Sequence, residues 1–218
     1  QAQDTAGPTG RGGELPVPPY SQQLHRDGHH GVGAGGASWC SPTSTSMVLG
    51  FWGRGPAEAE LAGIAAEVPD RAVAHAARTV FDHAFDGAGN WSFNTAYAAR
   101  YGVEAFVTRL RSLEEAERFV DAGIPLVASV SFRSEELDGA GYDTSGHLLT
   151  VVGFDAAGDV VCNDPASHQL PSNEEVRVVY DRKQLEKAWL DGSGGLVYVI
   201  RPPHVPLPPA AVPAEPSW

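Results

Sequence analysis

The sequence of 218 residues has only two cysteines, Cys40 and Cys162, and a single methionine. Two cysteines are too few for the disulfide framework that stabilises many small secreted domains. The sequence also lacks any apolar run of the roughly 20 residues that a helix needs to cross a bilayer, so we expect no membrane span. Lysine occurs only at positions 183 and 187, while alanine, glycine, proline and arginine are frequent, a bias typical of a GC-rich bacterial genome.

Positive charge is scarce in the whole chain. The net charge is −12 at pH 7 and the pI is about 5.0. This excess of acidic residues disfavours nucleic acids and anionic membranes as partners. The glycine-rich run at 33–36 does not follow a predicted strand, so it does not indicate a phosphate-binding loop, and we expect no cofactor. The length is sufficient for one large domain with a buried core.

The stretch at 36–44, Gly-Ala-Ser-Trp-Cys-Ser-Pro-Thr-Ser, places Cys40 between a glycine-rich loop and a helix start. Ser41 suits the N-cap position, and Pro42 suits the first helical position, where a missing N–H does no harm. A thiol at a helix N-terminus lies near unpaired N–H groups and the positive end of the helix dipole, which favour the thiolate. The stretch therefore predicts a nucleophilic cysteine.

Two later motifs supply partners for that cysteine. His147 opens an apolar, β-branched run, and a second predicted strand ends at Asn163-Asp164-Pro165. The start of one strand and the end of its neighbour can meet in space, and the order Cys, His, Asn/Asp is that of papain-like enzymes. Successive strand residues point to opposite sides, so only one of Asn163 and Asp164 should face His147. His168 is a weaker base candidate, because it lies in a turn-rich segment.

The motifs W-C-S-P-T-S, G-H-x-x-x-V-x-G and N-D-P-A resemble those of the C39-like peptidases, a papain-fold family, in its secreted bacterial branch. The resemblance extends over roughly residues 15–202. It implies that Cys40 is the nucleophile, that His147 is the base, and that Asp164 orients the imidazole. Asp164 is preferred over Asn163 because it precedes a proline, as in the Asp-Pro motif of the family.

The resemblance also implies an oxyanion donor upstream of the cysteine. In the family this donor is a glutamine, and the pattern Tyr-x-Gln matches best at Gln22, with Gln23 as the second choice. The alternative is that both glutamines are solvated loop residues. We further expect Trp39 and Gly146, which precede Cys40 and His147, to contact the substrate.

Two structural alternatives apply to the remaining cysteine and histidine residues. Cys40 and Cys162 could form one disulfide, but the apolar run 159–163 favours a buried, unpaired Cys162. His25, His29 and His30 lie in a glycine-rich loop that offers no rigid elements for a metal site, so we expect a solvated loop, a possible lid, and no metal.

The pattern of elements predicts an α+β papain-like fold, with a helical N-terminal half packed on an antiparallel β-sheet half and a cleft between them. We expect a flexible arm at 1–14, one domain at 15–201 and a proline-rich tail at 202–218. Helices are expected near 43–52, 56–66, 71–85, 91–101, 112–122 and 181–190, and strands near 103–110, 125–131, 147–154, 160–165, 176–180 and 195–200.

The sequence therefore predicts a monomeric thiol hydrolase that cleaves a peptide or related amide bond in a peptide or protein substrate. One alternative is an acyl transferase that uses the same triad, as transglutaminases do. The other is a non-catalytic binding or adhesion module with a papain-like fold. The start Gln1-Ala-Gln-Asp4 looks like a mature or trimmed N-terminus, so a secreted or cell-envelope location is expected.

Overall fold

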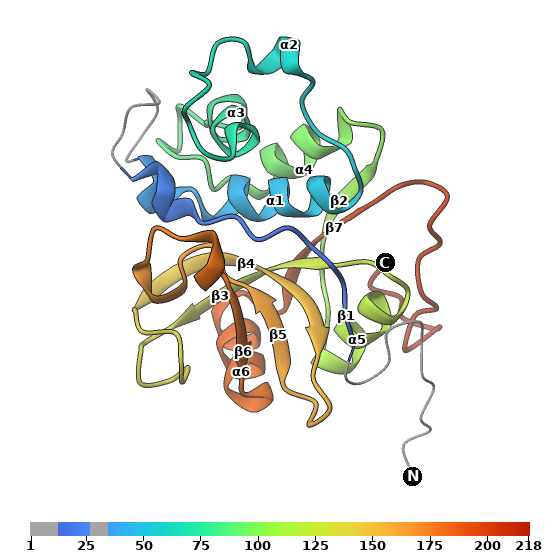
Figure 1. Ribbon diagram of the computed structural model, residues 1–218. Helices are drawn as coiled ribbons and strands as arrows, with labels where there is room; N and C mark the ends of the chain where they lie inside the picture. Colours follow the sequence, from blue (N-terminus) through green and yellow to red (C-terminus); the bar gives the residue numbers. More distant parts are fainter. Residues whose placement is uncertain (1–12, 27–34) are drawn as a thin grey trace.

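The computed structural model describes residues 13–26 and 35–218, and it confirms the expected α+β architecture (Figure 1). One antiparallel sheet runs through the molecule in the order β2-β7-β3-β4-β5-β6, and the short strand β1 pairs with β4. The helices of the N-terminal half lie above this sheet in Figure 1, and two later helices lie below it. Among the described residues, no helix is long and apolar enough to cross a membrane.

The expected strands are all present, with ends that differ by at most three residues, as at the start of β4, and the structure adds β1 within the expected N-terminal arm. The strands are β1 (Gly13–Glu14), β2 (Glu104–Arg109), β3 (Leu126–Phe132), β4 (Thr144–Phe154), β5 (Val160–Asn163), β6 (Arg177–Tyr180) and β7 (Leu196–Arg201). The helices are α1 (Cys40–Phe51), α2 (Glu58–Leu61), α3 (Arg71–Thr79), α4 (Trp91–Ala99), α5 (Leu113–Asp121) and α6 (Arg182–Ser193). Short 3₁₀ turns include η1 (Gln22–His25), η2 (Gly35–Ser38), η3 (Ser167–Gln169) and η4 (Asn173–Glu175).

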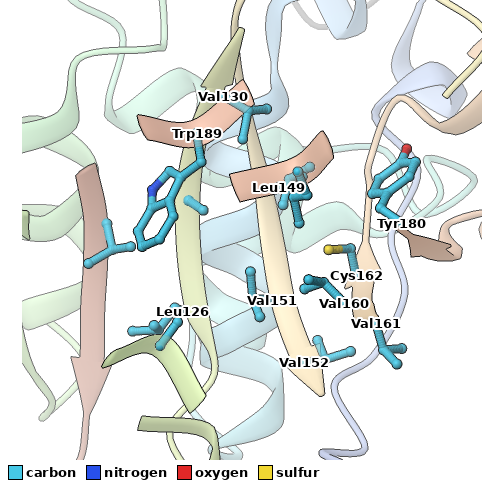
Figure 2. Packing of buried hydrophobic residues seen from close by; sticks show 14 of the residues in the cluster. Leu126, Val130, Leu149, Val151, Val152, Val160, Val161, Cys162, Tyr180 and Trp189 are labelled. Carbon is cyan, nitrogen blue, oxygen red and sulfur yellow. The ribbon is translucent and has the colours of Figure 1, made fainter. Parts of the chain in front are cut away.

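The sheet separates two hydrophobic cores. Alternate residues of β3 point to opposite faces, so Leu126 packs in the cluster with α5 and α6, while Val127 packs in the cluster with α1, α3 and α4. Figure 2 shows part of the first cluster, in which Cys162 lies beside Val160, Val151 and Leu149. Cys162 is fully buried and unpaired, as expected.

Helix α1 is buried on nearly all sides. Every residue from Ser41 to Leu49 is buried. The many serines and threonines of α1 allow this close packing, and Ser44 Oγ donates to the carbonyl oxygen of Leu148 at 3.1 Å, which attaches the helix to β4. The residue at the start of α1 is therefore fixed relative to the sheet.

The start of α1 also differs from the prediction, because Cys40 is itself the first helical residue and Trp39 is the N-cap. Ser41 does not cap the helix, since its Oγ forms a 2.8 Å hydrogen bond with the hydroxyl of Tyr198 on β7. Pro42 is the third helical residue, still within the first turn, where N–H groups have no intrahelical acceptor.

The two helices after α1 are shorter than expected. Helix α2 is a single turn, and α3 ends at Thr79 rather than near Phe85. The side chain of Asp82 accepts from the backbone N–H groups of Ala84 and Phe85, at 2.9 and 3.2 Å, and the backbones of Asp82 and Gly87 pair. These local hydrogen bonds favour a tight turn over a continued helix.

The ends of the described chain are packed on the domain. Sheet pairing starts at Gly13, two residues before the expected domain start. The C-terminal tail folds back on the surface, where the ring of Trp218 contacts Phe119 with centroids 4.8 Å apart, and Trp218 Nε1 donates to the carbonyl oxygen of Pro208.

Candidate active site

The structure brings Cys40, His147 and Asp164 together at the edge between the N-terminal helices and the sheet. Cys40 begins α1, His147 lies near the start of β4, and Asp164 directly follows β5. His147 Nε2 lies 2.8 Å from Asp164 Oδ1, and Cys40 and His147 line the same cleft, where each shifts the pKa of the other. Because Nε2 is engaged with Asp164, Nδ1 is the ring nitrogen left to interact with the sulfur.

The antiparallel pairing of β4 and β5 produces this meeting. Thr150 pairs with Asn163, so the beginning of β4 lies beside the end of β5. Asn163 points away from the imidazole, and its Nδ2 donates to the carbonyl oxygen of Val17 at 3.0 Å. The structure thus places Asp164, rather than Asn163, against His147. The other base candidate, His168, is exposed in the η3 turn.

Asp164 is completely buried, and each of its carboxylate oxygens accepts two hydrogen bonds. Oδ1 accepts from His147 Nε2 and from the backbone N–H of Ala166 at 2.9 Å, and Oδ2 accepts from the hydroxyls of Tyr142 and Tyr180, both at 2.7 Å. Burial alone raises the pKa of a carboxyl group, but the charge and hydrogen bonds of His147 and the two tyrosine hydroxyls lower the pKa of Asp164 below its ordinary value.

Tyr142 and Tyr180 are not among the site residues that the sequence predicts. Tyr142 comes from the loop before β4, and Tyr180 is the last residue of β6, where the alternating pattern indicates only an ordinary strand residue. No local sequence pattern marks either residue, because both approach Asp164 only when β4, β5 and β6 pair in the folded sheet.

The electrostatics of the site favour a charged pair between Cys40 and His147. Burial raises the pKa of the Cys40 thiol, but hydrogen bonding and charge from His147, with hydrogen bonds from the backbone of Leu148 and Ser41, give a net lowering. Burial lowers the pKa of His147, but the charge and hydrogen bond of Asp164 and the contact with Cys40 raise it to about 10. Both shifts stabilise a thiolate beside an imidazolium at neutral pH.

The two candidate oxyanion glutamines lie in different places, and both are buried, so neither is a solvated loop residue. Gln22 lines the same cleft as Cys40, and its Nε2 donates to the carbonyl oxygens of Gly36 at 2.8 Å and Ala37 at 3.2 Å. Gln23 Nε2 instead donates to Gln169 Oε1 at 3.1 Å. A Cβ atom on Gly36 would lie 2.1 Å from the Gln22 carbonyl oxygen, so this approach requires glycine.

A cleft of about 660 Å³ opens beside Cys40 and His147. Part of its wall is formed by Phe85 from the turn after α3 and by Trp91 from the start of α4, which are 67% and 38% exposed. Gly146 also lines the cleft, and its contact with a substrate stays a prediction.

The expected contact between Trp39 and the substrate is not supported. The side chain of Trp39 is only 1% exposed and packs in the helical core, where its ring lies 5.6 Å from that of His25. The start of α1 directs this ring into the helical core, so the ring does not face the cleft. His25, expected in a solvated loop, is also buried.

The other two histidines of that loop, His29 and His30, lie outside the described residues. Within 13–26 and 35–218, no group of three or more histidine, cysteine or acidic side chains is arranged to hold a metal ion.

In comparisons with known proteins, the sequence profile of the Peptidase_C39 like family matches residues 14–195 of this chain. No curated protein sequence matches the chain. Among solved structures, a C39-like peptidase from Bacillus anthracis aligns with 17% identity and a TM-score of 0.50, over 86% of this chain and 96% of that chain. At this identity the likeness concerns the fold, and it confirms the papain-like architecture expected from the sequence.

Two further solved structures align less well. The peptidase domain of Streptococcus ComA, described as a bifunctional ABC transporter involved in quorum sensing, shows 13% identity and a TM-score of 0.46, over 76% of this chain and 93% of that chain. A double glycine motif protease from an AMS/PCAT transporter, solved with a leader peptide, shows 17% identity and a TM-score of 0.46, over 75% and 84%.

Proposed function

Because the chain belongs to the Peptidase_C39 like family, we propose that it hydrolyses a peptide or related amide bond with Cys40 as nucleophile, His147 as acid and base, and Asp164 as orienting group. The observation that supports this proposal is the buried His147–Asp164 pair, with Nε2 and Oδ1 2.8 Å apart, at the wall of an open cleft that Cys40 also lines. A buried carboxylate, an imidazole and a partly exposed thiol in this order form the constellation of a thiol hydrolase.

The proposed reaction proceeds in two steps. Cys40 Sγ attacks the carbonyl carbon while His147, as imidazolium, gives its Nδ1 proton to the leaving amine, and a thioester forms. His147 then takes a proton from a water molecule, whose oxygen attacks the thioester. The carboxylic acid leaves, and the Cys40 thiolate is restored beside the His147 imidazolium. Asp164 accepts the Nε2 hydrogen bond throughout, so the ring keeps its orientation.

We propose that the backbone N–H of Cys40 and the side chain of Gln22 bind the oxyanion that forms during each step. The Cys40 N–H belongs to the first turn of α1 and has no intrahelical acceptor. Gln22 lines the cleft, and its longer hydrogen bond, 3.2 Å to the carbonyl oxygen of Ala37, is the one that the oxyanion would replace. Removal of one such donor typically lowers kcat by about 10²–10³-fold.

The wall of the cleft supports a peptide as the substrate. Phe85 and Trp91 present apolar surface in the same cleft as Cys40, and the hydrogen bonds of Asp82 hold this turn in place. Exposed aromatic side chains in a concave site commonly contact apolar groups of a ligand. An extended segment of a flexible or unfolded chain fits this arrangement.

The proposal is tested by incubating the protein with denatured casein in H₂¹⁸O that also contains a primary amine such as cadaverine, followed by mass spectrometry. We expect casein fragments whose new carboxyl groups contain ¹⁸O. In the blank, where a Cys40→Ala protein replaces the unaltered protein, we expect no such fragments. Acyl groups that carry the amine would indicate an acyl transferase instead. Intact casein, or fragments that also form in the blank, would contradict the proposed hydrolysis.

A further inference from the structure

The hydroxyl groups of Tyr142 and Tyr180 both donate to Oδ2 of Asp164, at 2.7 Å each. They come from separate elements, the loop before β4 and the end of β6, and converge on one atom. Tyr180 is fully buried in the core below the sheet, whereas Tyr142 lines the cleft and contacts the His147 ring edge to face, with centroids 5.6 Å apart.

The hydrogen bonds divide evenly between the two carboxylate oxygens. Oδ1 accepts from His147 and from the backbone of Ala166, while Oδ2 accepts from the two tyrosines. Rotation of the carboxylate group out of this orientation would break hydrogen bonds at both oxygens in a site with no solvent to replace them. The two hydroxyls therefore determine which way Oδ1 points.

We propose that Tyr142 and Tyr180 are positioning residues, whose hydroxyl groups hold the Asp164 carboxylate in the orientation that presents Oδ1 to His147 Nε2. This inference rests on the proposed function, because its consequence is exerted through His147 on Cys40. Neither tyrosine hydroxyl touches the reacting sulfur; each acts through Asp164.

The ionisable groups around Asp164 are consistent with this role. Burial and the nearby Asp164 charge raise the pKa of both tyrosines far above the ordinary value, so they stay protonated donors. Burial, and then Asp164, raise the pKa of Cys162 on β5 as well, so this neighbour stays a neutral thiol. His147 is therefore the group whose charge responds to the state of Asp164.

Removal of one hydroxyl leaves the Asp164 carboxylate free to turn toward its remaining donors, so the imidazolium loses a well-placed acceptor. This change weakens the thiolate–imidazolium pair, and Cys40 then becomes a thiolate only at higher pH.

The test is the pH profile of Cys40 alkylation by iodoacetamide in the Tyr180→Phe protein, which lacks only the hydroxyl of a residue outside the cleft. We expect the pH of half-maximal reactivity to rise by about one unit, because this is the size of effect that one hydrogen bond to a buried charge can produce. Tyr142→Phe should shift it in the same direction, and the double variant should shift it further.

Two matched controls separate positioning from general stability. Tyr97 is a buried tyrosine on α4 whose hydroxyl bonds His75 Nδ1 at 2.9 Å, so Tyr97→Phe should leave the pH of half-maximal reactivity unchanged. In an Asp164→Asn protein, the further change Tyr180→Phe should add no shift, because the carboxylate on which it acts is gone. Thermal unfolding of each variant shows whether the fold is intact.

An unchanged pH profile in Tyr180→Phe and in the folded double variant would overturn the inference, as would an equal shift in Tyr97→Phe. Failure of the proposed function would look different. In that case Cys40 of the unaltered protein would react no faster than an ordinary thiol, and the inference would fall with the function.

Discussion

Replacement of His147 with alanine is expected to lower peptide hydrolysis by about 10⁴–10⁶-fold, the range found when one member of a catalytic triad is removed. His147 forms a hydrogen bond with Asp164, and its influence lowers the pKa of the Cys40 thiol. Without it, burial leaves Cys40 as a neutral thiol near neutral pH, and the leaving amine has no proton donor. The rate of casein hydrolysis and the rate of Cys40 alkylation by iodoacetamide at pH 7 should therefore both fall sharply.

His168 provides the matched control for this experiment. It lies in the same half of the chain, but it is exposed in the η3 turn. His168→Ala should leave both the hydrolysis rate and the alkylation rate close to those of the unaltered protein. If the two histidine variants behave alike, the base has been assigned to the wrong residue.

Replacement of Asp164 with alanine is expected to lower kcat by about 10⁴-fold. The change removes the acceptor of the His147 Nε2 hydrogen bond and the negative charge that raises the pKa of His147 to about 10. The pKa of His147 should fall, so the thiolate–imidazolium pair becomes less stable. The pH at which Cys40 becomes reactive toward iodoacetamide should accordingly move upward, toward that of an ordinary thiol.

The neighbouring residue separates this electrostatic effect from a loss of structure. Asn163→Ala removes the buried hydrogen bond to the Val17 carbonyl group, which attaches the N-terminal segment to β5. This substitution should lower the midpoint of thermal unfolding and leave the pH profile of Cys40 alkylation unchanged. Loss of reactivity in Asn163→Ala, with Asp164→Ala unaffected, would reverse the assignment of the orienting residue.

Much of the fold could be predicted because its signals are local. The apolar, β-branched runs that became β3, β4, β5 and β7 are buried strands, and turn residues mark their ends. A meeting of His147 with Asn163 or Asp164 is predicted by the rule that the start of one strand can lie near the end of its neighbour, whereas the choice of Asp164 rests on the resemblance to the C39-like peptidases. Alternation along a strand also predicted that only one of Asn163 and Asp164 would face the imidazole.

Other features depend on contacts between distant segments, and local patterns do not record them. Ser41 looks like an N-cap, but the hydroxyl of Tyr198, far away in the sequence, is its partner. Trp39 and His25 look accessible in a loop, but they pack on each other in the core. For the same reason, no sequence pattern predicts that Tyr142 and Tyr180 bind Asp164. The monomeric state and the secreted or cell-envelope location stay predictions of the sequence.

The central claim, that Cys40 is an activated nucleophile, is tested most directly by iodoacetamide labelling of the intact protein across a range of pH, with each modified cysteine identified by mass spectrometry. Cys40 is partly exposed and its pKa is lowered, whereas burial and the charge of Asp164 hold the pKa of Cys162 well above its ordinary value. We predict that Cys40 is alkylated much faster than Cys162, and that its reaction begins below the pH at which a free thiol ionises. Equally slow modification of both cysteines, with the pH dependence of an ordinary thiol, would contradict the claim.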